Sequence, residues 1–281
     1  MTQDVYFLAM GHEQAMKAAP HQEIKHPEIS EIRVYPTSEE AAKEAASEIL
    51  KLVQANPHAR ITFATGNTMI ELYEALAKEV KEGKADFSRT TAFHLDEYYP
   101  CAANDEHSFV KYLRERVWGP LGIGKFHEIN GLAQDPEAET KHYDKLLSAQ
   151  PVNLAIIGTG PWSDETNSGC HIAFNESGTP FDSRTHVSQL DPLTVMRDRK
   201  ERGQDTPERS LTQGIANILE AEKIILLAFG EKKGVSLHQA LFGEIGTARP
   251  ASALRLVGNK VTLFIDQAAA SQLSPSKALV L

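Results

Sequence analysis

Apolar residues recur along this chain in two alternating patterns, one typical of buried strands and one typical of helices. Six short runs are rich in apolar and β-branched residues, as expected of strands covered on both faces; they are residues 32–35, 61–64, 91–95, 152–157, 223–229 and 261–265. Segments with helical spacing or helix-start signals separate them. This order predicts an α/β fold, a three-layer, doubly wound and mostly parallel sheet with helices on both faces.

Helix starts support this prediction. Thr37 and Glu40 have the spacing of a capping box, which indicates a helix from there to about Gln54. Apolar positions from Met69 to Val80 recur at helical spacing directly after the strand at 61–64. Ligands in such folds bind at the carboxyl ends of the strands, so the residues that follow each strand are the candidates for function.

The first 31 residues have no sustained apolar period. We therefore expect residues 1–31 to form an N-terminal extension that adds little to the core, and residues 32–281 to form a single domain. No internal repeat divides the chain. The extension could be a loose arm or could contact a second copy of the chain. A homo-oligomer is therefore one possible assembly.

Charge and cysteine content narrow the classes of partner. The chain has 29 Lys and Arg against 38 Asp and Glu, a formal net charge of -9 without a basic cluster, which argues against nucleic acid and anionic membranes as partners. Cys101 and Cys170 are too few for a disulfide framework or a thiolate metal site, and they fit a reducing compartment. The apolar stretch from Val5 to Met10 is too short for a signal or a membrane span, so we expect a cytoplasmic protein.

Three strand ends carry polar residues that suit chemistry. The turn made by Thr65, Gly66, Asn67 and Thr68 leaves a strand and opens a helix, where free amides attract a phosphate. The alternative is an ordinary turn capped by threonine. One glycine does not decide between them.

The second and third candidates are acid–base groups. Asp96 follows the strand at 91–95, and a partly desolvated carboxylate there can act as a general base. The alternative is that Asp96 caps a turn while Glu97 is solvated, with His94 packed in the core. His171 and Glu176, five residues apart, can form an oriented acid–base pair, although a lone histidine is more often structural.

As a set, these segments resemble the glucosamine-6-phosphate deaminase and isomerase family. The segments ATGNT, FHLDEYY, GTG with HIAFNESG, SRTH and SLTQGIANILEAEKIILLAFGEKK occur in the family's order from residue 32 onward, and HIAFNE is the most specific of them. The resemblance implies deamination and isomerisation of an aminohexose 6-phosphate, with a small sugar phosphate as partner and no metal or cofactor. It implies that Asp96 moves a proton between C2 and C1, that His171 and Glu176 assist ring opening, and that residues 65–68 bind phosphate.

Two departures from the family bear on the site. Thirteen positions separate Gly158 from His171, more than in the family, and Gly169 stands where a carboxylate or amide is usual. We expect the loop at 161–168 to act as a lid that brings Asp164, or else Glu165, to His171. The residues after the SRTH segment also depart from the family spacing, so the cations that would bind the phosphate are not fixed by it. The candidates are Arg199, Lys200, Arg209 and Lys233.

Three functions remain open on these grounds. The first is deamination of glucosamine 6-phosphate or its galacto epimer, and the second is hydrolysis of a sugar-phosphate lactone, which the related 6-phosphogluconolactonases catalyse on the same fold. The third is a sensor that binds a sugar phosphate without chemistry. The presence of Asp96, His171 and Glu176 together favours an enzyme.

Overall fold

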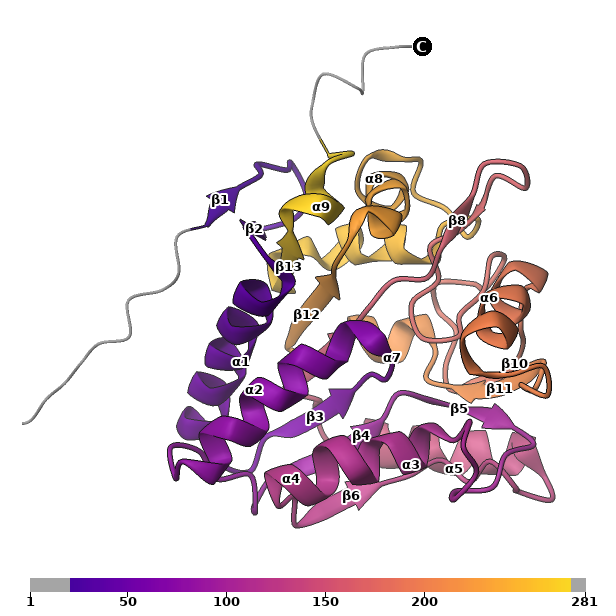
Figure 1. Ribbon diagram of the computed structural model, residues 1–281. Coiled ribbons are helices and arrows are strands. Elements are labelled where there is room, and N and C mark those ends of the chain that lie inside the picture. Colours follow the sequence, from indigo (N-terminus) through magenta and orange to yellow (C-terminus); the bar gives the residue numbers. More distant parts are fainter. Residues whose placement is uncertain (1–20, 274–281) are drawn as a thin grey trace, which may run out of the picture.

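The computed structural model describes residues 21–273, and its centre is an eight-stranded sheet (Figure 1). Every neighbouring pair is parallel except β1 with β2, so the predicted α/β class with a mostly parallel sheet is confirmed, and all six predicted strands are present. In order across the sheet the strands are β1 Gln22–Glu23, β2 Glu31–Tyr35, β13 Val261–Asp266, β12 Lys223–Ala228, β7 Leu154–Ile157, β3 Arg60–Phe63, β4 Thr91–His94 and β6 Lys125–His127.

The strand order reverses direction between β3 and β7. From β3 the chain proceeds outward through β4 to β6, then returns to the other side of β3 as β7 and continues through β12 to β13. The connections on the two sides of this point therefore diverge, which opens a crevice at the carboxyl ends of β3 and β7.

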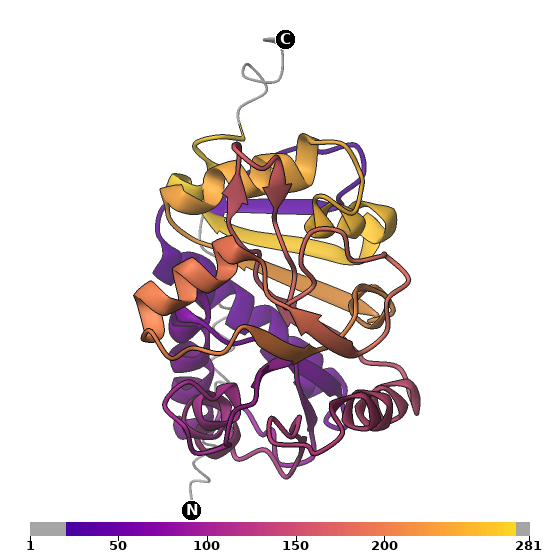
Figure 2. The same cartoon turned by 90° about the vertical axis from the view of Figure 1, so that its right-hand side faces the viewer.

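Helices cover both faces of the sheet. The long helices α1 Ser38–Ala55 and α2 Ile70–Lys81 pack together on one face, and Figure 2 shows α5 Pro136–Ser148 on the opposite face. Thr37 caps α1 by accepting a hydrogen bond from the Glu40 amide at 3.2 Å, as its sequence spacing predicted. The other helical segments are η1 Asn67–Met69, α3 Phe109–Leu113, η2 Arg114–Trp118, α4 Gly119–Leu121, α6 Pro192–Arg202, α7 Ile215–Leu219, η3 Glu231–Lys233, α8 Gly234–Phe242, η4 Pro250–Lys260 and α9 Gln267–Ala270.

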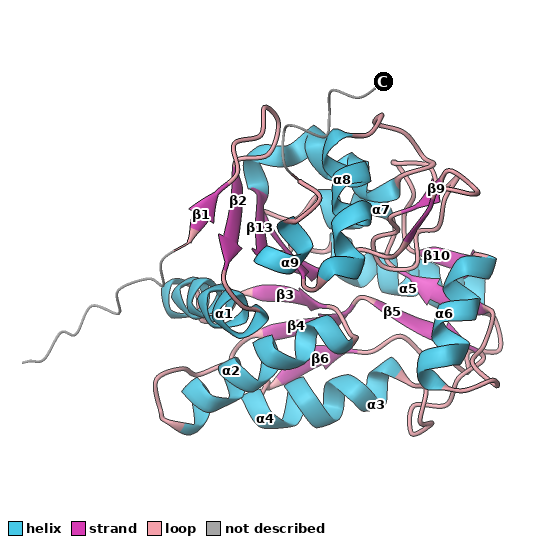
Figure 3. Ribbon diagram, turned by 45° about the horizontal axis from the view of Figure 1, so that its top comes forward, coloured by secondary structure: helices cyan, strands magenta, loops and turns pink. Residues whose placement is uncertain are grey.

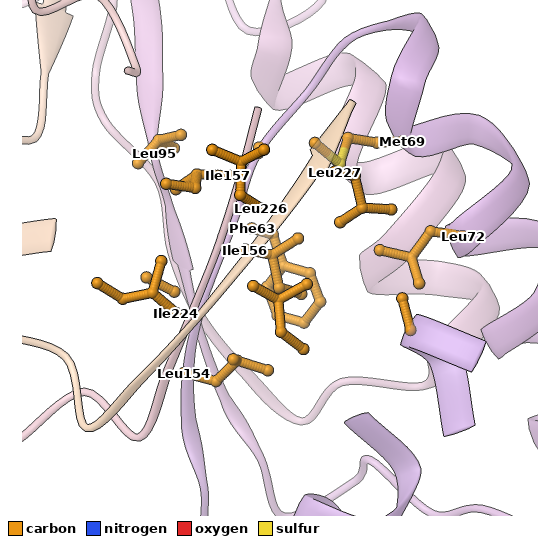
Figure 4. Packing of buried hydrophobic residues seen from close by; sticks show 14 of the residues in the cluster. Phe63, Met69, Leu72, Leu95, Leu154, Ile156, Ile157, Ile224, Leu226 and Leu227 are labelled. Carbon is orange, nitrogen blue, oxygen red and sulfur yellow. The ribbon is translucent and has the colours of Figure 1, made fainter. Parts of the chain in front are cut away.

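The central strands supply the core. Side chains of β7 and β12, such as Ile156 and Leu226, pack with Phe63 of β3 and with Met69 and Leu72 beneath α2 (Figure 4). All are essentially excluded from water, and burying each contributes roughly 1.5–3 kcal/mol. The continuous apolar runs in the sequence are thus explained by strands that are covered on both faces.

A second, antiparallel sheet lies beside the carboxyl ends of the first (Figure 3). It consists of β10 His186–Gln189, β11 Arg209–Thr212 and β5 Asp96–Tyr99. The chain leaves the main sheet after β4 and enters β5 one residue later, with Asp96 opposite Thr212. These strands escaped the sequence analysis because they are short and lack long apolar runs.

The described part of the N-terminal extension is packed onto the domain. Strand β1 pairs with β2 at the sheet edge, and Ile29, only 4% exposed, belongs to the main core. The expectation that residues before position 32 add little to the core is therefore wrong for Ile29; for residues 1–20 it falls outside the described part of the chain. Between residues 21 and 273, no helix is long and apolar enough to span a membrane.

Candidate active site

A cavity of about 210 Å³ opens at the carboxyl ends of the central strands. Its walls come from the residues after β3, β4, β7 and β12, from the loop around His171, and from α3 and α6. The residues that line it are Ala64, Thr65, Gly66, Asn67, Thr68, Met69, Leu95, Asp96, Phe109, Gly158, Thr159, Gly160, His171, Ala173, Phe174, Arg197, Asp198, Glu201, Arg202 and Lys233. The crevice predicted from strand order is thus occupied by most of the polar residues that the sequence singled out.

The turn at 65–68 forms one end of the cavity. Gly66 has φ of +105° and ψ of 170°, a backbone conformation that residues with a Cβ rarely adopt. The Tyr112 hydroxyl donates a hydrogen bond to the Gly66 carbonyl at 2.9 Å and fixes the turn from the side of α3 and η2. The start of η1 and α2 therefore faces the cavity, where its amides suit an anion.

Asp96 lies at the junction of the two sheets, 6% exposed and facing the cavity. Burial, with a smaller repulsion from Glu97, raises the pKa of Asp96 to about 8. Among residues 21–273, none of the hydrogen bonds involves its carboxylate. A carboxylate held without partners in a desolvated site is well suited to accept a proton.

Glu97 has the opposite surroundings. Its carboxylate accepts hydrogen bonds from the Phe109 amide at 3.0 Å, the Val110 amide at 2.9 Å and the Ser108 hydroxyl at 2.8 Å, and so caps α3. His94 is fully buried, and burial lowers its pKa to about 3, so it is a neutral core residue. The sequence left open that Asp96 caps a turn while Glu97 is solvated. The structure shows the opposite, because Glu97 is the cap and Asp96 has no hydrogen-bond partner among the described residues.

His171 and Glu176 form the pair that the sequence predicted. Nδ1 of His171 lies 3.0 Å from Glu176 Oε2, and both side chains are nine-tenths buried. Burial pushes the pKa of Glu176 upward, but attraction to His171 and hydrogen bonds from His171 and Thr194 outweigh it, so the pKa is lowered. The ring packs so closely on Gly160 that a Cβ there would lie 2.3 Å from it, which explains the glycine.

Hydrogen bonds of Asn175 and of Gln213, which follows β11, hold the loop around His171 beside β4. The Asn175 amide donates to the carbonyls of Ile172 and Gln213, both at 2.8 Å, and the Gln213 side chain donates to the His94 carbonyl at 2.9 Å. The histidine loop, β4 and the small sheet are thereby joined. The sequence analysis missed this role of Gln213, whose only signal was its place in the family segment SLTQG.

Of the predicted cations, only Lys233 reaches the cavity. Its Nζ donates to the Thr159 carbonyl at 2.6 Å, and burial, with repulsion from Arg197, lowers its pKa to about 8. Lys200 is exposed on the outer face of α6, and Arg209 stacks over the Tyr99 ring. Arg199 donates to Glu208 at 2.6 Å. The structure does not bring these three to the cavity.

Helix α6 supplies the cations that the sequence analysis missed. Arg197 and Arg202 line the cavity together with Asp198 and Glu201, at positions spaced four apart on one helix face. Asp198 accepts hydrogen bonds from Arg197 Nε at 2.8 Å and from the Tyr98 hydroxyl at 2.6 Å. The basic residues of α6 were visible in the sequence. Which of them face the cavity depends on how the helix packs, and the sequence does not show that.

The loop at 161–168 is not a lid in this structure. It forms the hairpin β8 Trp162–Ser163 and β9 Ser168–Gly169, in which Asp164 is exposed and accepts a hydrogen bond from Trp162 Nε1 at 2.7 Å. Arg249 stacks on the Trp162 ring and turns the hairpin toward the segment before η4. None of its residues lines the cavity. The group that approaches His171 is instead Thr194, with its hydroxyl 3.2 Å from Nδ1.

This arrangement brings a helix start that suits an anion together with groups that can transfer protons. A phosphate at residues 65–68 would leave the rest of a small molecule in the same cavity as Asp96 and His171. Nδ1 of His171 is engaged by Glu176, so Nε2 remains for a proton on the ligand. Such a site can move protons between neighbouring atoms of a phosphorylated sugar.

Comparison with known proteins gives consistent relatives. A family model described as glucosamine-6-phosphate isomerases/6-phosphogluconolactonase matches residues 36–263. Glucosamine-6-phosphate deaminase of Streptococcus suis is 35% identical over 212 residues, which cover 75% of this chain and 86% of that protein. The deaminase of Bacillus cytotoxicus is 34% identical over 249 residues, 88% of this chain and 90% of that protein.

Solved structures agree with the sequence relatives. A monomeric glucosamine-6-phosphate deaminase superposes with a TM-score of 0.79 at 32% identity, covering 86% of this chain and 99% of that one. A 6-phosphogluconolactonase from Trypanosoma brucei gives a TM-score of 0.66 at 19% identity, covering 86% of this chain and 98% of that one. The second likeness is one of fold.

Proposed function

Because this chain belongs to the family of glucosamine-6-phosphate isomerases and 6-phosphogluconolactonases, we propose that it converts an aminohexose 6-phosphate into the ketohexose 6-phosphate and ammonia. The observation that carries the proposal is the Asp96 carboxylate, buried at the cavity wall without a hydrogen-bond partner among the described residues and with its pKa raised to about 8. Two relatives that are 34–35% identical to this chain, and that it covers to 86–90% of their length, are glucosamine-6-phosphate deaminases.

The substrate is held by its phosphate in this proposal. The amides and hydroxyls of residues 65–68 receive the phosphate oxygens, and Lys233 and Arg197 supply positive charge from the facing wall. The phosphate is then fixed at one end of the cavity, so the sugar carbons extend toward Asp96 and His171.

Ring opening and proton transfer follow from the two remaining groups. Nε2 of His171 accepts the proton of the C1 hydroxyl and returns it to the ring oxygen as the C1–O5 bond breaks, while Glu176 stabilises the charged imidazole. Asp96 then removes the proton from C2 while a proton of the substrate's ammonium group passes to O1, and Asp96 returns its proton to C1, which leaves a hydroxyl at C1 and a protonated imine at C2. Water adds to the imine and ammonia departs. Each step is a proton transfer or a hydrolysis, so the proposed reaction calls for no metal or cofactor.

The compartment and assembly are part of the proposal. We place the reaction in the cytoplasm, supported by Cys101 and Cys170, which are both free thiols. The monomeric glucosamine-6-phosphate deaminase that superposes on this chain supports a catalytic unit made of one chain.

The test is release of ammonia from glucosamine 6-phosphate and galactosamine 6-phosphate, with 6-phosphogluconolactone as the competing substrate. We expect ammonia and ketose phosphate from at least one amino sugar, and lactone hydrolysis no faster than the uncatalysed rate. Lactone hydrolysis without ammonia release would replace the proposal with the lactonase function. Tight binding of the amino sugars without turnover would indicate a sensor.

A further inference from the structure

Helix α6 contacts the rest of the site at successive turns. Near its start, Thr194 lies 3.2 Å from His171 Nδ1; one turn later, Asp198 accepts the Tyr98 hydroxyl at 2.6 Å; at its end, Arg202 stacks over the Phe109 ring at 4.8 Å. The helix that presents Arg197 and Glu201 to the cavity is therefore joined to the acid–base pair at its start, through the Thr194 hydroxyl and the backbone of its cap residue Asp191.

We propose that Thr194 is a positioning residue that holds His171 with its proton on Nδ1 and its free electron pair on Nε2, toward the substrate. The proposal rests on the deaminase function above, because it assigns His171 the proton transfer of ring opening. Nothing in the family resemblance assigned a role to this position, which stands 23 residues after the histidine.

The hydrogen-bond geometry fixes the direction of each proton. Glu176 is ionised at neutral pH because its pKa is lowered, so its carboxylate is an acceptor only and Nδ1 must donate to it across 3.0 Å. The Thr194 hydroxyl also donates to Glu176, which leaves its oxygen lone pairs toward Nδ1. Both partners of Nδ1 then require a proton on that nitrogen, and the opposite tautomer would face two acceptors.

Thr194 is placed to affect catalysis and not substrate affinity. It is 1% exposed and does not belong to the cavity lining, so it does not touch the substrate. Glu176 Oε1 is buried without a partner among the described residues, and besides His171 and Thr194 this carboxylate receives a hydrogen bond only from the Asp191 backbone. Removing the hydroxyl should let the carboxylate and the ring turn, which lowers the fraction of His171 in the productive tautomer.

Thr194→Val tests the proposal, since valine keeps the shape of threonine and lacks its hydroxyl. We expect kcat for ammonia release to fall about fivefold to tenfold, the size expected for the loss of one hydrogen bond, with KM within about twofold of the parent. Thr194→Ser keeps the hydroxyl and should restore kcat to within about twofold of the parent.

Nitrogen NMR of the histidine-labelled protein gives a readout that packing alone would not move. His171 should show a protonated Nδ1 in the parent and the serine variant, and a mixture of tautomers in the valine variant. Parent-like kcat and a parent-like tautomer in a folded valine variant would overturn the proposal. If that variant does not fold, Thr194→Ala is judged by the same criteria.

His171→Asn separates this inference from the proposed function. If His171→Asn keeps full ammonia release, the role of the pair in the deaminase proposal is wrong, and the Thr194 proposal falls with it. If His171→Asn is inactive and Thr194→Val is unchanged, only the Thr194 proposal is wrong.

Discussion

Asp96 and Glu97 are neighbours in the sequence, yet the structure gives their carboxylates opposite surroundings. Glu97 accepts four hydrogen bonds from Tyr98, Ser108, Phe109 and Val110, whereas the Asp96 carboxylate accepts none within residues 21–273. Burial raises the pKa of both groups, and only Glu97 is compensated. The difference marks Glu97 as a structural group. Burying Asp96 without hydrogen bonds destabilises the folded state, which is typical of a residue kept for function.

Asp96→Asn should remove activity and increase stability. A neutral amide cannot accept the C2 proton, so we expect turnover to fall by about a hundredfold to ten-thousandfold. Folding raises the pKa of Asp96 from 3.8 to about 8, so the ionised carboxylate destabilises the folded state increasingly as the pH rises through this range. The variant should therefore melt above the parent at pH 8.5 and at nearly the same temperature at pH 4. The comparison needs ammonia assays and thermal unfolding at both pH values.

Glu97→Gln is the matched control for that prediction. It also replaces a buried carboxylate with an amide, but the amide NH2 would face backbone donors at the start of α3. We expect a loss of stability on the order of 2 kcal/mol, since hydrogen bonds to a charged acceptor are removed. A stabilised Glu97→Gln or a destabilised Asp96→Asn would contradict the assignment of the two roles.

The pH dependence of kcat/KM should be a narrow bell near pH 8. Below that pH the base Asp96 becomes protonated, because burial raises its pKa to about 8, and activity falls. Above it Lys233 loses its charge, because burial lowers its pKa to about 8, and phosphate binding weakens. Lys233→Arg should extend the basic limb, since a guanidinium stays charged. A profile that is flat between pH 6.5 and 9.5 would rule out both groups.

At the scale of elements, the turn into α2 depends on one backbone conformation. Gly66 has φ of +105°, and no atom lies within 4 Å of where a Cβ would be, so the constraint there is conformational and not steric crowding. Gly83 follows the other end of α2 and also has a positive φ, +73°, with open space around it. It does not line the cavity. The two glycines form a matched pair.

Gly66→Ala should raise KM at least tenfold, because the strained turn must shift the amides that receive the phosphate. Gly83→Ala should cost about 1 kcal/mol of stability and leave KM unchanged. Steady-state kinetics with calorimetric titration of inorganic phosphate measures both effects. Equal KM values for the two variants would show that the turn at Gly66 does not bind the phosphate.

The hairpin of β8 and β9 shows how an insertion can be accommodated away from a site. Gly169 has φ of +133° and its amide donates to Ser177 at 2.8 Å, so the chain turns back toward His171 while the inserted residues point outward. The sequence indicated that an acid from this loop would complete the histidine pair. The structure gives that position to Thr194 of α6, since a helix fixed at several points can hold a hydroxyl group more firmly than a two-residue ladder can.

At the scale of the whole molecule, residues before the first predicted strand help to close the core. Ile29 packs with the main cluster, and the Ser30 amide donates to the Gly258 carbonyl at 3.0 Å, so the approach to β2 is tied to the end of η4. The apolar periodicity of this segment is too short to be detected, because a single buried isoleucine has no period.

Ile29→Ala should lower the free energy of unfolding by about 3 kcal/mol, as expected for a large-to-small change in a packed core. Leu132→Ala is the control, because Leu132 is 57% exposed and its truncation should change stability by less than about 0.5 kcal/mol. Denaturant unfolding of the two variants measures the difference. Equal effects would place Ile29 outside the cooperative core.

The sequence by itself determined the parts of this protein that depend on local pattern. Continuous apolar runs are sufficient to identify strands covered on both faces, and the capping spacing at Thr37 is sufficient to begin α1, because each signal lies within a few residues. The motif with His171 and Glu176 was equally local, since five positions separate its members. The position of the cavity at the strand ends followed from the order of elements.

Only the tertiary structure decided which polar groups share the cavity and what state they have there. Arg197 and Arg202 enter the cavity through the packing of α6, and Lys200 and Arg209 are turned away, although all four lie between residues 197 and 209. The contrast between Asp96 and Glu97 likewise depends on amides of α3, more than ten residues away. Desolvation and hydrogen bonding are properties of the assembled surroundings, so no local pattern in the sequence carries them.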